Sequence, residues 1–285
     1  MRLLVTADLH YNHPRSRGLA DSLIDDINRT GGDALLLIGD TAVGDGDVLE
    51  QCLSRFTIVG PKLFVAGNHE LWTRGPDSYH LFKRDLPARV GALGWHWLQD
   101  QPFVAGETTI VGSVGWYDYS FAQASLGIPH RFYEAKVSPG AAEHLEEWRF
   151  LLDRQDDLSE HARSVVARWN DGRFVKLHRS DTAFVEELCE QLDSQLANVS
   201  TPRVLAAVHH LPFRELLPPP RTAQWDFAKA YLGSERLGEV LLRHEKVTEL
   251  LCGHSHFPTE ATVGHVHAVN IGSGYRSKTF KTLEI

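Results

Sequence analysis

Seven residues of metal-binding types lie in short polar motifs spread over most of the chain. They are Asp8, His10, Asp40, Asn68, His209, His254 and His256. The set combines carboxylates, imidazoles and one amide without a thiolate, and such ligands suit Mn, Fe or Zn at a catalytic centre better than a structural zinc. Seven ligands exceed the need of one ion, so the set predicts two divalent cations. A shared carboxylate would hold them about 3.5–4 Å apart, and Asp40, which follows a central predicted strand, is the candidate for that bridge.

Each motif directly follows a short apolar run that is typical of a strand buried on both faces of a parallel sheet. In open α/β sheets the carboxyl ends of the strands meet at one edge, where ligand sites are built. A single pair such as Gly39-Asp40 is more often a simple turn, so the prediction depends on the agreement of several motifs. Gly67 is expected to allow a sharp turn before Asn68. The strands expected before the motifs cover residues 2–7, 34–38, 62–66, 203–208 and 247–251.

Helical patterns connect the predicted strands. Apolar residues recur at helical spacing in 17–29, and helices are also expected at 47–55 and over most of 223–244. Further short strands are expected at 95–99, 102–105 and 108–114, and two or three antiparallel strands in the tail from 261 to 285. The chain is therefore expected to form a single α/β domain over residues 1–285.

The stretch from about 117 to 200 departs from this alternation because it is rich in helix formers and charge. Helices are expected near 139–154, 160–168 and 181–197, and we interpret the stretch as a helical insertion rather than a separate domain. Its entry carries three aromatic residues, Trp116, Tyr117 and Tyr119. These side chains could line a substrate cleft or anchor the insertion to the core, and the sequence leaves both alternatives open.

The overall charge and composition limit the classes of partner. A net charge of -8 and a pI near 6.0 create no field that would attract nucleic acid or an anionic membrane, so any phosphorylated partner must be captured locally. Cys52, Cys189 and Cys252 are expected to be free thiols in a reducing compartment. Neither a signal peptide nor a membrane-spanning run is evident, which predicts a soluble cytoplasmic protein. The sequence leaves the oligomeric state open.

Five motifs, taken in their order along the chain, resemble the signature of the calcineurin-like metallophosphoesterases. They are Asp8-x-His10, Gly39-Asp40, Gly67-Asn68-His69-Glu70, His209 and Gly253-His254-Ser255-His256. The resemblance covers residues 2 to about 257 without the insertion, and it implies a four-layer α/β/β/α sandwich with a dinuclear centre at one edge. It implies that one ion is bound by Asp8, His10, Asp40 and His256, and the other by Asp40, Asn68, His209 and His254. Of the pair His209-His210, the family pattern selects the first.

One departure from the family pattern lies just after Asp40. Many members carry an Asp-Arg pair there, which orients the catalytic histidine and contacts phosphate, whereas this chain has Val43 and Gly44. The difference weakens the case for a protein Ser/Thr phosphatase, and Asp45 or Asp47 could replace the missing carboxylate. The basic residues that could contact a substrate phosphate are Arg74, as the first choice for a substrate-binding residue, and Arg15 or Arg17.

The ligand set and the resemblance together predict a metal-dependent hydrolase of phosphate esters. A water or hydroxide bridging two divalent ions, Mn as the first choice and Fe, Zn or Ni as alternatives, would attack phosphorus in line with the leaving oxygen. His69 is assigned to protonating the leaving group or binding phosphoryl oxygens. We expect a small-molecule or nucleotide monoester or diester as substrate. The alternatives are a nuclease acting on nucleic acid ends and a catalytically silent scaffold of the same fold.

Overall fold

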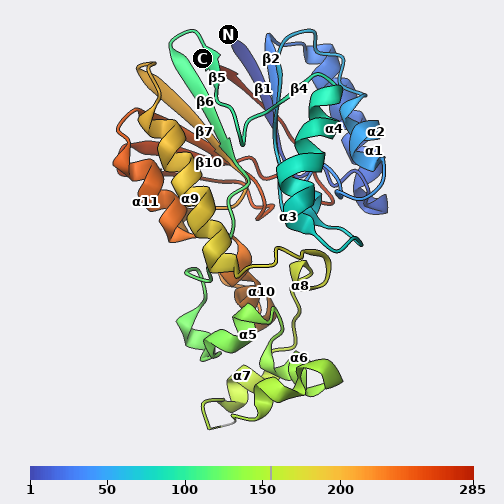
Figure 1. Ribbon diagram of the computed structural model, residues 1–285, viewed down its shortest axis with the longest axis vertical. Coiled ribbons are helices and arrows are strands. Elements are labelled where there is room, and N and C mark those ends of the chain that lie inside the picture. The colour runs from blue at the N-terminus through green and yellow to red at the C-terminus, as the bar shows by residue number, and fades with distance from the viewer. Residues whose placement is uncertain (155) are drawn as a thin grey trace.

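Two β-sheets packed face to face form the centre of the computed structural model, which describes residues 1–154 and 156–285 (Figure 1). The first sheet has the order β11-β1-β2-β3-β4, in which β1 to β4 are parallel and β11 is an antiparallel edge. Its strands are β1 (Arg2–Thr6), β2 (Ala34–Ile38), β3 (Lys62–Val65), β4 (Trp95–Trp97) and β11 (Lys281–Glu284).

The second sheet has the order β5-β6-β7-β8-β10-β9. Its four inner strands are parallel, and β5 and β9 are antiparallel edges. Its strands are β5 (Phe103–Ala105), β6 (Thr108–Ser113), β7 (Arg203–Val208), β8 (Val247–Cys252), β9 (Thr259–Val263) and β10 (Val266–Asn270).

Apolar side chains from both sheets fill the space between them. Leu3 and Leu36 of the first sheet belong to the same buried cluster as Leu205 and Leu251 of the second. Because side chains alternate along a strand, the residues in between, such as Leu35, pack under the helices on the outer face. Burial on both faces explains why the strands are continuous aliphatic runs in the sequence.

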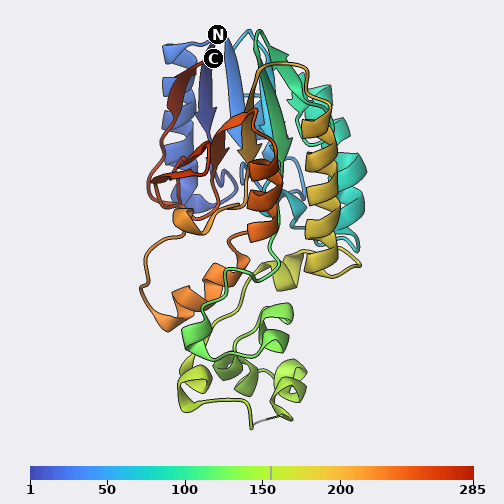
Figure 2. The ribbon, with the colours of Figure 1, turned by 90° about the vertical axis from the view of Figure 1, so that its left-hand side faces the viewer.

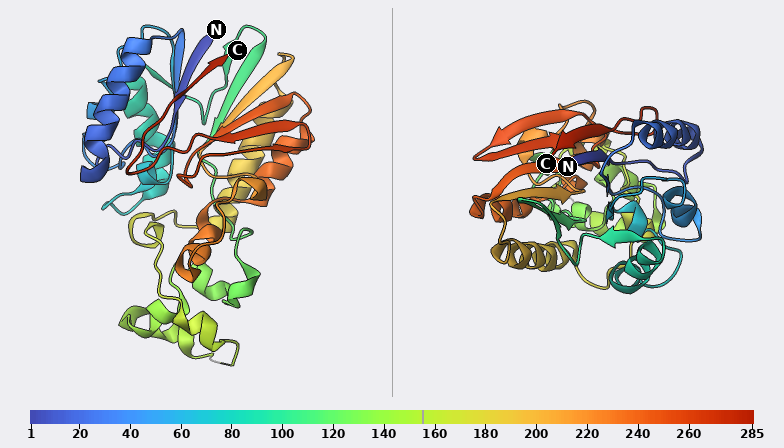
Figure 3. Two further views of the ribbon diagram at one scale, coloured as in Figure 1. Left: turned by 180° about the vertical axis from the view of Figure 1, so that it is seen from behind. Right: turned by 90° about the horizontal axis from the view of Figure 1, so that it is seen from above.

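Helices cover the outer face of each sheet (Figures 1 and 3). The first sheet carries α1 (Pro14–Thr30), α2 (Val48–Leu53), α3 (Ser78–His80) and α4 (Leu86–Ala92), and the second carries α9 (Asp181–Ala197) and α11 (Glu235–Arg243). This order of helices, sheet, sheet and helices confirms the predicted α/β fold class. The helices α3 and α4 and the π-helical turn Leu81–Asp85 were not predicted, because Pro87 and Gly91 interrupt the helical pattern there.

A group of short helices projects beyond the sandwich (Figure 2). It contains α5 (His130–Glu134), α6 (Pro139–Glu143), the 3-10 helix Glu146–Leu152, α7 (Glu160–Ser164), α8 (Asp171–Phe174) and α10 (Ala223–Ala228). Between residues 117 and 200 the chain forms these short helices, except α10, and then α9, which covers the second sheet; the helical insertion and its bounds stay a prediction. The projection also includes α10, from a segment after β7.

Several predicted helices are shorter than the sequence pattern indicated, because their backbones pair with other segments. Near 160–168, α7 ends at Ser164 because the carbonyls of the following residues accept hydrogen bonds from the backbone N–H groups of Ser138 and Gly140. The predicted helix at 139–154 ends at Glu143 and continues only as a 3-10 helix. The predicted helix at 223–244 is broken before α11, where the Leu211 backbone bonds to Leu232 and Ser234. In contrast, α9 has the predicted bounds of 181–197.

The C-terminal tail forms three strands, as predicted, but they belong to different sheets. β9 and β10 make an antiparallel pair, and β10 also pairs in parallel with β8. β11 crosses to the first sheet and pairs antiparallel with β1. The tail therefore connects the two sheets at their edges rather than closing one of them.

The aromatic residues at the start of the projection anchor it to the core. Trp116 and Tyr117 are fully buried, and Tyr119 is nearly so. Trp116 Nε1 donates to Asp181 at 2.7 Å, and the Tyr117 hydroxyl donates to Asp171 at 3.0 Å. Of the two alternatives left open by the sequence, these contacts favour anchoring.

Two further features bear on the predictions from composition. All three cysteines are free and buried, as expected. Within the described residues, no helix is both long and apolar enough to cross a bilayer.

Candidate metal centre

The seven predicted ligands converge at the carboxyl ends of five parallel strands. Asp8 and His10 follow β1, Asp40 follows β2, and Asn68 follows β3. The other three ligands lie in the second sheet, where His209 follows β7 and where β8 is followed by His254 and His256. Five of the seven have positive φ angles between 43° and 66°, namely Asp8, His10, Asp40, His254 and His256. Such angles are uncommon for residues other than glycine, and they cluster at functional sites. The backbone at this edge of the sandwich is therefore strained, as is typical of a functional site.

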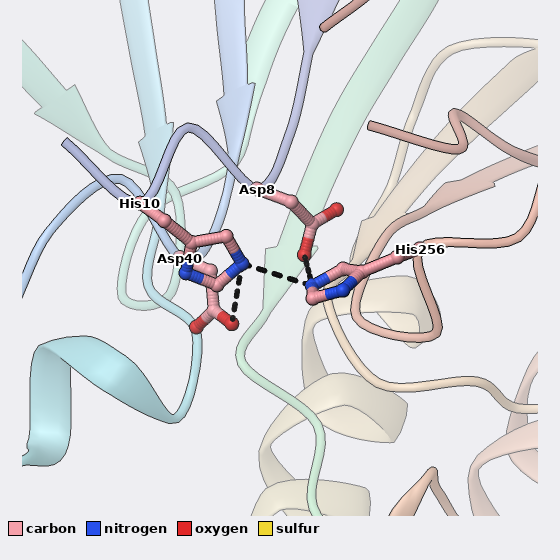
Figure 4. A group of neighbouring side chains, drawn as sticks. All are labelled: Asp8, His10, Asp40 and His256. Carbon is pink, nitrogen blue, oxygen red and sulfur yellow. Dashed lines mark hydrogen bonds and ion pairs between the residues drawn. The ribbon is translucent and has the colours of Figure 1, made fainter. Parts of the chain in front are cut away.

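One group of ligands is formed by Asp8, His10, Asp40 and His256 (Figure 4). His10 Nε2 lies 2.9 Å from His256 Nε2 and 3.8 Å from Asp40 Oδ2. His256 Nε2 lies 3.5 Å from Asp8 Oδ1. Two imidazole nitrogens and two carboxylates pointing at a common point are suitable ligands for a divalent cation.

A second group of ligands contains Asp40, His209 and His254. His209 Nε2 lies 3.3 Å from Asp40 Oδ1, while its Nδ1 contacts the Ile38 carbonyl at 2.9 Å. His254 contacts the Tyr231 carbonyl through Nε2 at 3.2 Å. A ring nitrogen that donates to a backbone carbonyl leaves the other nitrogen with a lone pair, which is how metal-binding histidines are usually oriented. Asp40 belongs to both groups, as expected for a bridging carboxylate.

Several buried polar atoms at this site have no hydrogen-bond partner among the described residues. Nearly all buried polar groups in folded proteins are paired, so unpaired ones call for an explanation. The atoms at the predicted ligands are Asp8 Oδ2, His10 Nδ1, Asn68 Oδ1, His209 Nε2 and His254 Nδ1. Four of these atoms belong to residues of the two ligand groups, and the fifth, Asn68 Oδ1, belongs to a residue that lines the same cavity as Asp40 and His254. The residues present therefore fit a pair of divalent cations.

The choice between His209 and His210 is clear from the geometry. His210 is also buried, but its Nδ1 contacts the Val114 carbonyl at 2.8 Å and it belongs to neither ligand group. Burial and the neighbouring His209 lower the pKa of His210 to about 3. The first histidine of the pair is thus the one placed at the centre.

Electrostatics favour an ionised Asp40. Burial alone would raise the pKa of its carboxyl, but His69 and His209 outweigh burial and hold it well below its usual value. Burial lowers the pKa values of His10 and His254 well below that of a free imidazole. Burial also acts to lower the pKa of His209, but the Asp40 carboxylate reverses the effect and raises it to about 9. Ionised carboxylate and neutral imidazole are the forms that bind metals, so Asp40, His10 and His254 are in the binding form, whereas His209 would release a proton when it binds a cation.

Glu70, which the motif contains but to which the sequence analysis gave no role, connects the loops after β2 and β3. Its fully buried carboxylate accepts hydrogen bonds from the backbone N–H groups of Asp40, Thr41, Ala42 and Gly67, at 2.9, 2.7, 3.0 and 2.6 Å. Burial, with the nearby Asp40, raises its pKa to about 7. Glu70 therefore holds the backbone that carries the proposed bridging ligand.

At Gly39 and Gly67 neighbouring atoms lie too close to leave room for a side chain. A Cβ atom at Gly39 would lie 2.2 Å from His209 Nδ1, and one at Gly67 would lie 2.3 Å from Asp40 Oδ1. Gly39 has a φ of 74°, whereas Gly67 has no positive φ. Lack of space, rather than a positive φ, is therefore the reason for a glycine at position 67, and the chain turns directly after it at Asn68.

His69 lies beside the two ligand groups. Its Nε2 is 3.7 Å from Asp40 Oδ2, its ring stacks on Trp72 at 3.8 Å, and it lines the cavity over the centre. Neither ring nitrogen bonds to Asp45, which instead accepts from the Thr73 hydroxyl at 2.6 Å and the Arg74 backbone at 2.5 Å. Stacking on an indole, rather than the missing carboxylate, is thus what supports the His69 ring here.

Arg74 is exposed and lines a different hollow, next to Val43 and Asp45. The structure therefore does not bring it into the cavity that contains Asp40 and His69. Its role in substrate binding stays a prediction.

A cavity of about 250 Å³ opens over the two ligand groups. Its walls include four aromatic residues that the sequence analysis did not single out, namely Trp72, Trp169, Trp225 and Tyr275, and one cation, Arg168. Tyr275 stacks on His10 at 4.2 Å. Residues 168–170 lie between α7 and α8, and Trp225 lies in α10, so no strand-end pattern could have indicated them.

A family comparison identifies the chain. The sequence model of the calcineurin-like phosphoesterases matches residues 1–258. The chain belongs to the calcineurin-like phosphoesterases. This result confirms the resemblance inferred from the five motifs, and the Asp and His cluster of this calcineurin-like phosphoesterase is a possible site for the divalent metals that the family uses.

Solved structures with the same fold include a hydrolase and a phosphatase. The phosphopantetheinyl hydrolase PptH from Mycobacterium tuberculosis is 19% identical, with a TM-score of 0.68, and the match covers 96% of this chain and 89% of that one. A dimetal phosphatase from Danio rerio is 17% identical, with a TM-score of 0.52, over 96% and 88% of the two chains. No curated protein sequence matches the chain.

Proposed function

We propose that this calcineurin-like phosphoesterase hydrolyses phosphate esters at a centre of two divalent cations. The observation that carries the proposal is the position of Asp40, which is shared by two ligand groups at the strand ends. Unpaired buried atoms in both groups support it. All seven expected ligands are present, which argues against a catalytically silent scaffold.

The side chains around the centre have separate tasks in this reaction. Divalent cations bound there would supply an activated water and positive charge for the phosphoryl oxygens. Asn68 and the histidines at the strand ends would hold the cations, together with Asp8 and with Asp40, which belongs to both ligand groups. His69, at the edge of the cavity, is placed to give a proton to the leaving oxygen or to bind a phosphoryl oxygen. Trp72, Trp169 and Trp225 form indole walls of the cavity.

The cavity supports a small substrate. A volume of about 250 Å³ holds a phosphoryl group and a modest part of the alcohol attached to it. With the net charge of -8, this favours a small-molecule or nucleotide ester over a nucleic acid. PptH is by its name a phosphopantetheinyl hydrolase, so we include a phosphopantetheinyl ester among the candidates.

The test is a substrate screen with defined metals. Protein stripped by a chelator is reconstituted separately with Mn, Fe, Zn and Ni and assayed with p-nitrophenyl phosphate, bis(p-nitrophenyl) phosphate, nucleotides and a phosphopantetheinyl ester. We expect metal-dependent hydrolysis, highest with Mn, which is lost in Asp40→Asn. Hydrolysis that is unaffected by chelation or by Asp40→Asn would overturn the proposal.

A further inference from the structure

One buried carboxylate of the projection reaches the candidate metal centre. Asp171 is the first residue of α8 and is only 1% exposed. It contacts Asn68, which lies 103 residues earlier in the chain. Asp171 thus joins the projection to a predicted metal ligand by a hydrogen bond.

The carboxylate of Asp171 accepts hydrogen bonds from four side chains. Oδ1 accepts from Asn68 Nδ2 at 2.9 Å and from Trp72 Nε1 at 2.6 Å. Oδ2 accepts from the Tyr117 hydroxyl at 3.0 Å and from Trp169 Nε1 at 2.7 Å. All four partners are donors, and a carboxylate is the side chain that can accept from all of them at once.

The bond to Asn68 decides which end of its amide is available to a cation. An asparagine amide has one donor end and one acceptor end, and only the oxygen can bind a metal. Because Nδ2 is held by Asp171, Oδ1 is left free, and this oxygen is buried without a partner in the described structure. Turning the amide over would place its oxygen against the Asp171 carboxylate, which is repulsive.

The two indoles bonded to Asp171 also touch residues of the centre. Trp72 stacks on His69 at 3.8 Å. Trp169 stacks on Tyr231 at 5.2 Å and meets the His254 ring edge-on at 5.9 Å. One carboxylate therefore fixes a predicted ligand and two walls of the cavity.

We propose that Asp171 is a positioning residue, which keeps the Asn68 oxygen available to a cation and braces the Trp72 and Trp169 walls. The projection then contributes directly to the geometry of the metal centre and its cavity. The inference deepens the proposed function, on which it rests for the presence of metal.

Asp181 offers a matched control. It is a second buried carboxylate of the same region, and it also accepts from aromatic side chains, namely Trp116 and Tyr119, and from Lys136. No contact joins it to a predicted metal ligand among the hydrogen bonds of the described residues. If Asp171 had a purely structural role, replacing it should therefore affect metal binding no more than replacing Asp181.

The experiment compares Asp171→Ala with Asp181→Ala. Calorimetric titration of chelator-treated protein with Mn measures affinity and stoichiometry, and thermal unfolding measures stability. We expect both variants to lower the unfolding temperature, but only Asp171→Ala to weaken Mn binding, by about 10- to 100-fold, as for other residues that orient metal ligands. Equal Mn affinity in the two variants would overturn the inference.

A double variant tests whether Asp171 acts through Asn68. If it does, Asn68→Ala and Asn68→Ala/Asp171→Ala should bind Mn about equally, because the second change removes nothing further from the ligand. Additive losses of affinity would contradict the inference.

A second variant keeps the inference testable if Asp171→Ala does not fold. Asn68→Asp retains a ligand oxygen but places a carboxylate beside Asp171. We expect weaker Mn binding in Asn68→Asp and partial recovery in Asn68→Asp/Asp171→Asn, whereas wild-type affinity in Asn68→Asp would refute the role of Asp171. These readouts do not need turnover: a wild type that binds Mn but hydrolyses nothing would refute only the proposed function, and one that binds no Mn would refute both.

Discussion

Replacement of Glu70 by Gln tests how the candidate centre is held together. The carboxylate accepts four backbone hydrogen bonds, two at each oxygen, in a fully buried position. In Glu70→Gln one oxygen becomes an NH₂ group, so two backbone N–H groups would face a donor. Leaving a buried donor unpaired costs about 1–3 kcal/mol, so we expect a loss of about 3 kcal/mol in the free energy of unfolding for the pair.

Metal binding should also weaken, because either amide orientation removes a bond to the backbone of residues 40–42: Oε2 accepts from Asp40, and Oε1 accepts from Thr41 and Ala42. Urea unfolding of the chelated protein gives the free energy, and calorimetric titration with Mn gives the affinity. Glu50→Gln is the control: it alters a half-exposed ion pair with Arg89, for which we expect a change below about 1 kcal/mol and an unchanged Mn affinity. A Glu70→Gln protein that matches the control in both measurements would refute the reasoning.

Three further predictions follow from single contacts. Gly39→Ala should abolish Mn binding in a calorimetric titration, because its Cβ would lie 2.2 Å from His209 Nδ1; retained binding would contradict the packing. His69→Ala should lower kcat by about 100-fold or more while Mn stoichiometry stays the same, as for loss of a general acid; loss of metal instead would make His69 a ligand. Burial acts to raise the pKa of Glu187, but its bonds to Lys83 and Tyr79 outweigh burial and lower it. The ionised Glu187 therefore adds to the free energy of unfolding above the unfolded-state pKa of about 4.3. This stabilisation is lost as the pH falls through the lower pKa of the folded state. Glu187→Gln should therefore be less stable than wild type by up to about 1 kcal/mol at pH 7, with a gap that closes below about pH 4, and a gap independent of pH would contradict it.

The strand ends and their ligands could be predicted because both signals are local. A strand buried on both faces is a continuous aliphatic run, as in Ala34–Ile38, and the residues after it lie at the edge where parallel strands end together. Parallel topology then brings Asp40 and His209 within 3.3 Å, although they are far apart in sequence.

The supporting residues could not be predicted because their roles depend on distant partners. Asp171 has no local pattern that marks it, and its contacts lie as far away as Asn68. The helix ends near Val165 and Leu232 also depend on backbone pairing with other segments, which helical periodicity does not encode. Glu70 stood within a recognised motif, but its role becomes apparent only from the four backbone groups that it contacts.

The most direct test of the account is anomalous diffraction from crystals soaked in Mn. We predict two peaks, one on each side of the Asp40 carboxylate. The first should be in contact with Asp8, His10 and His256, and the second with Asn68, His209 and His254. A single peak that excludes one of these groups, or no peak at Asp40, would contradict the dinuclear centre on which the proposed hydrolysis depends.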